Sequence, residues 1–228
     1  MVRTGTVIWY ISLCIVCCYY DGVFTTGNEH PHTVGVFCSA EDTVAQSHKN
    51  AAYSLGRLLG LNGFKLVTGG SNKGLMRHVN DGYVSTGSQE VYAIVPEILQ
   101  TYDIVHWGIW NENVIWTDTL HQRLAQFQAQ CDCMIILPGG FGTLHELIDF
   151  LTHYQFGYIT PDIIILNHEG FWSPLLQQFE AMVASNALEA ALLRIIHVAD
   201  TPQSCIQHLM RTRMTSHVYV PSCHHHEA

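Results

Sequence analysis

Apolar residues follow two alternating spacings along the chain from residue 33 onward. Short apolar runs, typical of buried strands, alternate with longer segments in which apolar residues recur every three to four positions, as on one face of a helix. The predicted strands are 33–38, 64–67, 91–95, 114–116, 133–137, 162–166 and 195–198. The predicted helices are 44–59, 75–84, 120–127, 144–151, 173–185 and a last segment that starts at 200–202. This alternation predicts an α/β fold in which helices cover both faces of a doubly wound parallel sheet.

The pattern divides the chain into one domain with a short segment on either side. Residues 33–213 carry the alternating elements, and 228 residues suffice for one sizeable α/β domain but not for two ordinary ones. Residues 1–32 combine an apolar segment with a polar linker, and residues 214–228 form a polar tail. Within the domain, residues 97–112 have no clear period and carry two tryptophans, which fits either a lid or a partner surface.

The apolar stretch 7–20 near the N-terminus has two interpretations. It is too short to span a bilayer comfortably, but it resembles the apolar region of a signal peptide, with Arg3 ahead of it. No clear small-residue cleavage site follows it. We expect an N-terminal extension on a cytoplasmic protein, and an N-terminal signal or membrane anchor is the alternative.

The charge of the chain argues against nucleic acid as a partner. The 10 Lys and Arg residues are outnumbered by 19 Asp and Glu residues, which gives a formal net charge of −9, and no run of basic residues is present. Nucleic acids and anionic membranes bind basic surfaces, so neither is an expected partner. A small phosphorylated ligand is compatible with this charge, because backbone N–H groups and a single arginine hold an anion without a basic surface.

The cysteines and histidines do not predict a metal site. The 8 cysteines are scattered, which is not the dense framework of a disulfide-stabilised protein. Cys131 and Cys133 have one residue between them and no second pair, so two buried thiols are favoured over zinc. The run His224–His226 fits a solvated tail better than a metal site. We expect neither a metal ion nor a cofactor.

A glycine-rich turn joins the fifth predicted strand to the helix that follows it. Its glycines are Gly139, Gly140 and Gly142. At such a turn the first N–H groups of the helix lack partners and carry the positive end of the helix dipole, and glycines let an anion approach them closely. Thr143 adds a hydroxyl donor, and Glu146 lies one helical turn further on. The turn therefore predicts a phosphate site with a carboxylate beside it.

A second glycine-rich turn, with Gly69, Gly70, Ser71 and Gly74, follows the second predicted strand. In a parallel sheet both turns, together with Ser39 after the first strand, lie at the carboxyl edge, where ligands bind. A single turn of this kind also fits a tight loop that needs glycine for packing. Two such turns on one edge indicate a site for a phosphorylated ligand more strongly than either alone.

Together, the motifs resemble the LOG family of cytokinin-activating phosphoribohydrolases, whose members are often labelled possible lysine decarboxylases. The segment Pro138–Glu146 reads PGGFGTLHE and resembles the family motif PGGxGTxxE. Gly69–Met76 resembles the GGGxxGLM turn, and Leu120–Arg123 resembles the M-H-x-R segment. QFG at 155–157 and ILN at 165–167 resemble the family's QLG and LLN pieces. The ordered motifs make the resemblance specific, and it covers roughly residues 33–211.

The resemblance implies a Rossmann-like fold, a homodimer or larger homo-oligomer, and Arg123 and Glu146 as the catalytic pair. The residues that would bind phosphate and ribose are Ser39, Gly69, Gly70, Ser71, Gly74, Met76, Gly139, Gly140, Gly142 and Thr143. His121 lies near the arginine in the sequence and fits either an acid for the departing base or a core histidine bonded to the backbone. Candidate dimer surfaces are the tryptophan-bearing stretch 97–112 and the helix after Glu146, with Phe150, His153, Tyr154 and Phe156.

The sequence departs from the family pattern at four places. Leu124 replaces the usual lysine, Ser71 replaces the third glycine of the GGGxxGLM motif, and His145 replaces an acid. The first strand ends in Cys38-Ser39-Ala40-Glu41 instead of Cys-Gly-Ser-Ser. Because the catalytic pair is kept, we expect hydrolysis of a nucleoside 5′-monophosphate, (N6-modified) adenosine 5′-monophosphate, to ribose 5-phosphate and free base. The departures leave a non-catalytic nucleotide- or phosphate-binding Rossmann protein as the alternative.

Other chemistries fit the residues less well. Decarboxylation of lysine usually needs pyridoxal phosphate on a lysine, and none of Lys49, Lys65 and Lys73 has an evident partner for the pyridine nitrogen. Neither turn reads G-x-G-x-x-G, and no acidic residue follows the second strand at the place that a dinucleotide ribose needs.

In glycoside cleavage positive charge develops on the sugar, so a carboxylate such as Glu146 would stabilise that charge and activate water. Arg123 would bind phosphate, or position the ribose and Glu146.

Overall fold

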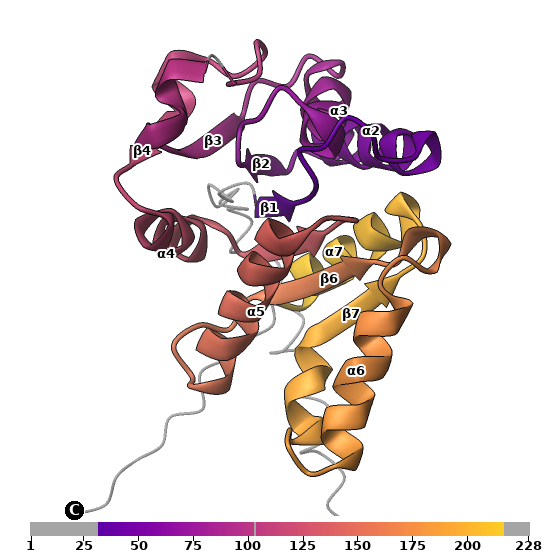
Figure 1. Ribbon diagram of the computed structural model, residues 1–228. Helices are drawn as coiled ribbons and strands as arrows, with labels where there is room; N and C mark the ends of the chain where they lie inside the picture. The colour runs from indigo at the N-terminus through magenta and orange to yellow at the C-terminus, as the bar shows by residue number, and fades with distance from the viewer. Residues whose placement is uncertain (1–31, 103, 217–228) are drawn as a thin grey trace, which may run out of the picture. The chain divides into compact units, whose positions relative to one another are not determined.

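The computed structural model describes residues 32–102 and 104–216 (Figure 1). The apolar stretch 7–20 and the end of the polar tail, from residue 217, lie outside the described residues, so the interpretations of both stay predictions. Across the described part, no helix is both long enough and apolar enough to cross a membrane.

Seven strands form one sheet in the order β4-β3-β2-β1-β5-β6-β7 (Figure 1). Every neighbouring pair of strands is parallel. The strands are β1 (Thr33–Phe37), β2 (Lys65–Thr68), β3 (Val91–Pro96), β4 (Val114–Thr117), β5 (Cys133–Ile136), β6 (Asp162–Leu166) and β7 (Ile196–Ala199). The predicted parallel α/β fold is therefore confirmed, and each predicted strand end lies within one residue of the observed end.

Helices cover both faces of the sheet. They are α2 (Gln46–Leu61), α3 (Gly74–Val84), α4 (Leu120–Gln130), α5 (Phe141–Gln155), α6 (Ser173–Ala184) and α7 (Pro202–Ser216). Short 3-10 helices are η1 (Glu97–Tyr102), η2 (Asn111–Asn113), η3 (His168–Gly170) and η4 (Ala190–Ile195). One apolar core packs α2, α3 and α7 against the sheet, and the other packs α4, α5 and α6. The sheet is thus doubly wound.

The two cores explain why the central strands are apolar without interruption. In β6, Ile164 and Leu166 belong to the core beneath α2, while Ile163 and Ile165 belong to the core beneath α5. Successive side chains of a strand point to opposite faces, so a strand that is covered on both faces needs apolar residues at every position. All four of these side chains are fully buried.

The strand order reverses between β1 and β5, because the chain adds β2, β3 and β4 on one side of β1 and the later strands on the other. In open parallel sheets, ligands bind at the carboxyl ends of the strands beside such a reversal. The turn after β5 is one of the two predicted glycine turns, and the turn after β2 follows the other neighbour of β1. The fold therefore gathers both glycine turns around the end of β1.

Two local features extend the predicted elements, and one prediction needs correction. Thr119 caps α4, since its hydroxyl accepts the N–H of Gln122 in the first turn at 3.2 Å. The last helix continues to Ser216, three residues past residue 213. Phe150 is buried, with 1% of its surface exposed, and therefore cannot belong to a dimer surface.

Candidate active site

Three segments at the carboxyl edge are tied together by hydrogen bonds. The N–H of Ser39, after β1, donates to the carbonyl oxygen of Pro138 at 3.0 Å, where the turn after β5 begins. The carbonyl oxygen of Ser39 accepts the N–H of Leu75, at the start of α3, at 2.9 Å. The N–H of Gly74 donates to Oδ1 of Asp42 at 2.9 Å. The segment after β1 thereby holds both glycine turns in fixed positions, with Ser39 between them.

The turn after β2 requires glycine at two positions. Gly70 and Gly74 have φ angles of 75° and 56°, which residues with a Cβ atom rarely adopt. A Cβ atom on Gly74 would also lie 2.6 Å from the backbone nitrogen of Glu41. The buried hydroxyl of Thr68 accepts the N–H of Gly70 at 3.0 Å and holds the start of the turn. The turn is therefore shaped before any ligand binds.

Residues 104–109 pack on this turn, which the sequence did not predict. The N–H of His106 donates to the carbonyl oxygen of Gly70 at 2.7 Å. The ring of His106 is fully buried, and its Nε2 lies 2.9 Å from Oδ1 of Asp81 on α3. The segment is thus anchored on both sides, while Trp107 beside it is 72% exposed. Whether Trp107 serves a lid or a partner surface stays a prediction.

The turn after β5 combines one packed glycine with two open ones. A Cβ atom on Gly139 would lie 2.1 Å from Oγ1 of Thr143, so packing accounts for this glycine. A Cβ atom on Gly140 or Gly142 would meet nothing within 4 Å. The tight-loop alternative therefore explains only part of the turn. The open space lies at the N-terminus of α5, where partnerless N–H groups and the helix dipole favour an anion.

Arg123 of α4 and Glu146 of α5 form a buried ion pair next to these turns. Nη1 of Arg123 donates to Oε1 of Glu146 at 2.5 Å, and the two side chains are 12% and 10% exposed. Nε of Arg123 donates to the carbonyl oxygen of Ile94 at 3.0 Å, and its guanidinium carbon lies 5.0 Å from the centre of the Phe127 ring. Gly69 lies against the guanidinium group, because a Cβ atom there would come within 2.6 Å of Nη2. Both the backbone of β3 and the turn after β2 therefore fix the position of the arginine.

Burial controls the proton affinity of the groups in this site. Burial raises the pKa of Glu146 above its usual range, and the charge and hydrogen bond of Arg123 oppose that rise. Burial, together with the charge of Glu146, raises the pKa of the Cys38 thiol far above its usual range. Cys38 therefore stays a neutral thiol rather than a thiolate nucleophile. Of Glu146 and Cys38, the glutamate is therefore the candidate general base, and its raised pKa makes its carboxylate a stronger proton acceptor than an ordinary glutamate.

The other predicted residues fall into different environments. Ser71 and Met76 are buried, and the N–H of Ser71 contacts Sδ of Met76 at 3.0 Å, so the methionine shapes the turn. His121 is exposed on α4, so the alternative of a core histidine is wrong and the role of an acid stays a prediction. Leu124, at the position of the family's lysine, is 4% exposed. His145 is exposed beside Glu146.

Asp42 and His106 support the site without belonging to any motif. Asp42 follows β1 at the edge where the turns meet, and that position was the only signal that the sequence offered. His106 lies in a stretch without hydrophobic period, 36 positions from Gly70, to which its backbone N–H donates. Only the tertiary structure could assign it to the turn after β2.

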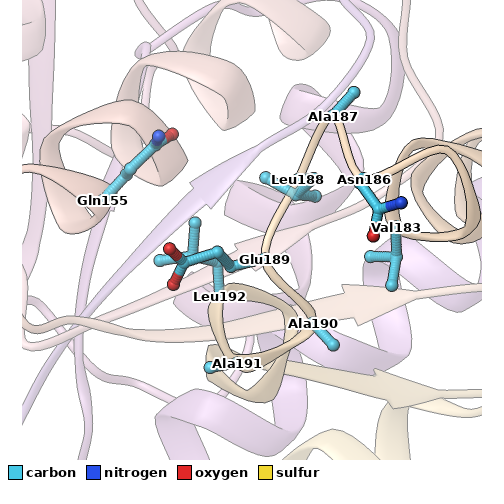
Figure 2. Close-up of a pocket in the computed structure, with 9 residues that line it drawn as sticks. All are labelled: Gln155, Val183, Asn186, Ala187, Leu188, Glu189, Ala190, Ala191 and Leu192. Atoms are coloured by element: carbon cyan, nitrogen blue, oxygen red, sulfur yellow. The ribbon is translucent and has the colours of Figure 1, made fainter.

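An open hollow of about 850 Å³ lies elsewhere in the structure (Figure 2). Its lining consists of Gln155, Val183 and the segment 186–192. Gln155 is the last residue of α5 and Val183 lies at the end of α6. Both helices begin at the carboxyl edge and run back along the sheet, so the hollow lies at the opposite edge from the glycine turns. Only Glu189 in its lining is charged, and the hollow offers no cluster of reactive groups.

The fold and the site define a class of protein: a Rossmann-like α/β protein with a polar site at the reversal of its strand order. The profile of the family described as "Possible lysine decarboxylase" matches residues 76–209. A probable cytokinin riboside 5'-monophosphate phosphoribohydrolase of Oryza sativa subsp. japonica is 31% identical over 176 residues, which are 77% of this chain and 71% of the relative. A cytokinin riboside 5'-monophosphate phosphoribohydrolase of Arabidopsis thaliana is 33% identical over 172 residues, 75% and 79% of the two chains. The chain belongs to this family, the LOG family.

Solved structures agree with the fold. The molybdenum cofactor binding protein of Rippkaea orientalis matches with a TM-score of 0.60 and 25% identity, over 82% of this chain and 99% of that one. The molybdenum cofactor carrier protein of Chlamydomonas reinhardtii matches with a TM-score of 0.60 and 16% identity, over 81% and 99% of the two chains. At 16% identity the second match supports the fold alone.

Proposed function

We propose that this protein hydrolyses the N-glycosidic bond of adenosine 5′-monophosphate or of its N6-modified forms, giving ribose 5-phosphate and the free base. The observation that carries the proposal is the buried pair of Arg123 and Glu146 beside two glycine turns. The names of the relatives in Oryza sativa and Arabidopsis thaliana supply the class of substrate. The proposal requires no cofactor.

The nucleotide phosphate would bind at the N-terminus of α5, where Gly140 and Gly142 leave open space. Ser39 lies between the two turns, and its hydroxyl would donate to the ribose or the phosphate. A phosphate held at this turn would leave the anomeric carbon of the sugar near α5, on which Glu146 lies one helical turn after Gly142. Binding energy from the phosphate would then position the bond that breaks.

In the reaction, water attacks the anomeric carbon, the carbon–nitrogen bond breaks, and its electron pair leaves with the base. Ionised Glu146 would stabilise the positive charge that develops on the sugar and would accept a proton from the attacking water. Its raised pKa brings its proton affinity nearer to neutral pH. Arg123, fixed by the carbonyl of Ile94, would orient the carboxylate and favour its ionised form. The departing base gains a proton, for which exposed His121 is the candidate donor.

The lysines do not fit the decarboxylase chemistry that the family description names. Nζ of Lys49 donates to the carbonyl oxygen of Asp42 at 2.5 Å, and Lys65 pairs with Glu90 at 3.5 Å. Lys73 is exposed just before α3. A lysine that binds pyridoxal phosphate must reach into a pocket with a partner for the pyridine nitrogen, and these three do not. Lysine decarboxylation is therefore not proposed.

A non-catalytic nucleotide-binding protein is the second candidate. The 25% identical structure from Rippkaea orientalis is named a molybdenum cofactor binding protein, so this fold also occurs in proteins named for binding. The buried Leu124, where the family has lysine, favours the same alternative. Both candidates use the glycine turns, and they differ in whether Glu146 acts on a bound sugar.

Turnover of purified protein with adenosine 5′-monophosphate and an N6-substituted analogue distinguishes the candidates. We expect the wild type to release free base, and Glu146→Ala to lose about 100-fold or more in rate. Asp149→Ala is the matched control, because Asp149 lies one turn further along α5 and accepts a hydrogen bond from Gln128 at 2.6 Å, away from Arg123. Tight binding without release of base would support the second candidate. Equal release by Glu146→Ala would contradict the first.

A further inference from the structure

Two histidines and a glutamate gather at the carboxyl end of β6, apart from the glycine turns. His48 lies in the first turn of α2, and His168 and Glu169 begin η3 directly after Asn167. One nitrogen or oxygen of each side chain lies within 4.8 Å of the corresponding atoms of the other two. The rings of His48 and His168 lie edge to face, with their centres 5.5 Å apart.

One buried atom of the group lacks a partner, and one residue of the group has an unusual backbone conformation. Nδ1 of His48 is buried and has no hydrogen-bond partner, which is costly for a polar atom. Glu169 has a φ angle of 55°, in the left-handed region that a residue with a side chain rarely adopts. The hydroxyl of Ser47 donates to Oε2 of Glu169 at 2.9 Å, so the strained residue has its carboxylate held beside α2.

The backbone around Glu169 is fixed by Asn167. The N–H of Asn167 donates to the carbonyl oxygen of Ala199 at 2.8 Å. Its side-chain oxygen accepts the N–H of Trp172 at 2.7 Å, and its side-chain nitrogen donates to Oγ of Ser173 at 3.1 Å. The connection between β6 and α6 is therefore held in shape before any ligand binds, as a binding site requires.

We propose that His48, His168 and Glu169 bind one divalent transition-metal ion of the zinc type, which joins α2 to the connection between β6 and α6. Two imidazoles and one carboxylate are ligands of zinc and its neighbours, whereas magnesium and calcium prefer oxygen ligands alone. Metal–ligand bonds of about 2.1 Å place tetrahedral ligand atoms roughly 3.4 Å apart, so the side chains need to close only slightly around the ion. Ser47 orients the carboxylate from outside, a role that hydrogen-bond partners of metal ligands commonly have.

The three side chains occupy three of the four coordination positions of the ion and leave the fourth for water. None of its ligands belongs to the glycine turns or to the pair of Arg123 and Glu146. The site therefore stabilises the fold rather than taking part in the hydrolysis, and the proposal does not depend on the proposed function. No spacing in the sequence predicts it, since His48 and His168 are 120 positions apart.

The test needs a background without the histidines of the C-terminal tail, because weak zinc binding by three adjacent imidazoles would be counted together with binding at the proposed site. The full chain is therefore prepared with His224→Asn, His225→Asn and His226→Asn, and metal is removed with a chelator. Calorimetric titration with ZnCl2, the visible spectrum with CoCl2 and the melting temperature are then measured. We expect one zinc ion per chain, cobalt bands of a four-coordinate site and a rise of the melting temperature with zinc.

In this background His168→Asn and Glu169→Gln are each expected to weaken zinc binding by about 100-fold, and Ser47→Ala by about 10-fold. His153→Asn is the matched control, because this half-buried histidine bonds to the carbonyl of Asp149 and should leave zinc binding unchanged. Far-ultraviolet circular dichroism without metal checks that each variant folds, and Glu169→Gln, with its exposed side chain, keeps the test valid if His168→Asn does not fold. Loss of zinc binding with the tail substitutions alone, or normal binding by both ligand variants, would overturn the proposal.

Discussion

Gly69 lies directly against the guanidinium group of Arg123. A Cβ atom at this position would be 2.6 Å from Nη2 of Arg123 and 3.2 Å from Sδ of Met76. The φ angle of Gly69 is not positive, so space, rather than backbone freedom, demands glycine here. The turn after β2 and the ion pair of Arg123 with Glu146 are thus parts of one packed site.

Gly69→Ala should displace Arg123 and thereby misplace the carboxylate of Glu146. We expect the rate of base release to fall roughly 100-fold, because a shift of about 1 Å in a catalytic group has effects of that size. The added methyl should also destabilise the fold by about 1–3 kcal/mol, as overpacking does. Steady-state kinetics and urea denaturation measure the two effects. A variant with normal turnover would show that the position of Arg123 does not matter for the reaction.

Gly142→Ala tests the other turn and serves as a partner to the previous variant. A methyl group at this position meets nothing within 4 Å, and Gly142 lies in the first turn of α5, so stability should stay equal or rise by about 0.5–1 kcal/mol. If phosphate binds at this turn, the methyl should hinder its approach and raise KM about tenfold or more. An unchanged KM for adenosine 5′-monophosphate would place the phosphate elsewhere.

The stability of the protein should depend on pH through Glu146. Burial raises the pKa of Glu146, so the folded protein keeps this proton at pH values where the unfolded chain has lost it. Relative to Glu146→Gln, the wild type should therefore be most stable below the ordinary pKa of glutamate, about 4.3. Its relative stability should fall as pH rises from there through the raised pKa, and should be constant above it. Urea denaturation of both proteins across this range measures the difference, and a relative stability that rises with pH would contradict the direction of the shift.

We propose a homodimer that uses the exposed side of α5. Ile148 is 43% exposed on this helix, and Phe156 and Tyr158 directly after it are 68% and 76% exposed, which is unusual for apolar side chains so close together. Light scattering at micromolar concentration should give the mass of a dimer for the wild type. Phe156→Glu should give a monomer with unchanged circular dichroism. A monomeric wild type would rule the proposal out.

The sequence by itself determined the sheet and its apolar strands. A strand such as β6, apolar at four successive positions, must be covered on both faces, and the helical spacing between strands requires parallel crossovers. The glycine turns could also be predicted from the sequence, because a positive φ angle or the close approach of another group restricts a position to glycine. Gly70 and Gly74 show this directly through their positive φ angles. The family followed from the same local motifs.

Only the tertiary structure decided which side chains meet. The family resemblance named Arg123 and Glu146 together, but their ion pair joins two different helices and follows from no local pattern. His106 reaches Asp81 across 25 positions from a stretch without any period. The same holds for His48 and His168. Such contacts depend on how strands are ordered and helices packed, and neither local conformation nor hydrophobic period carries that information. The helices, strands and glycine turns could therefore be predicted from local sequence patterns, because they depend on local backbone conformation and hydrophobic period. The charge pairs and the proposed metal site could not, because they depend on long-range packing.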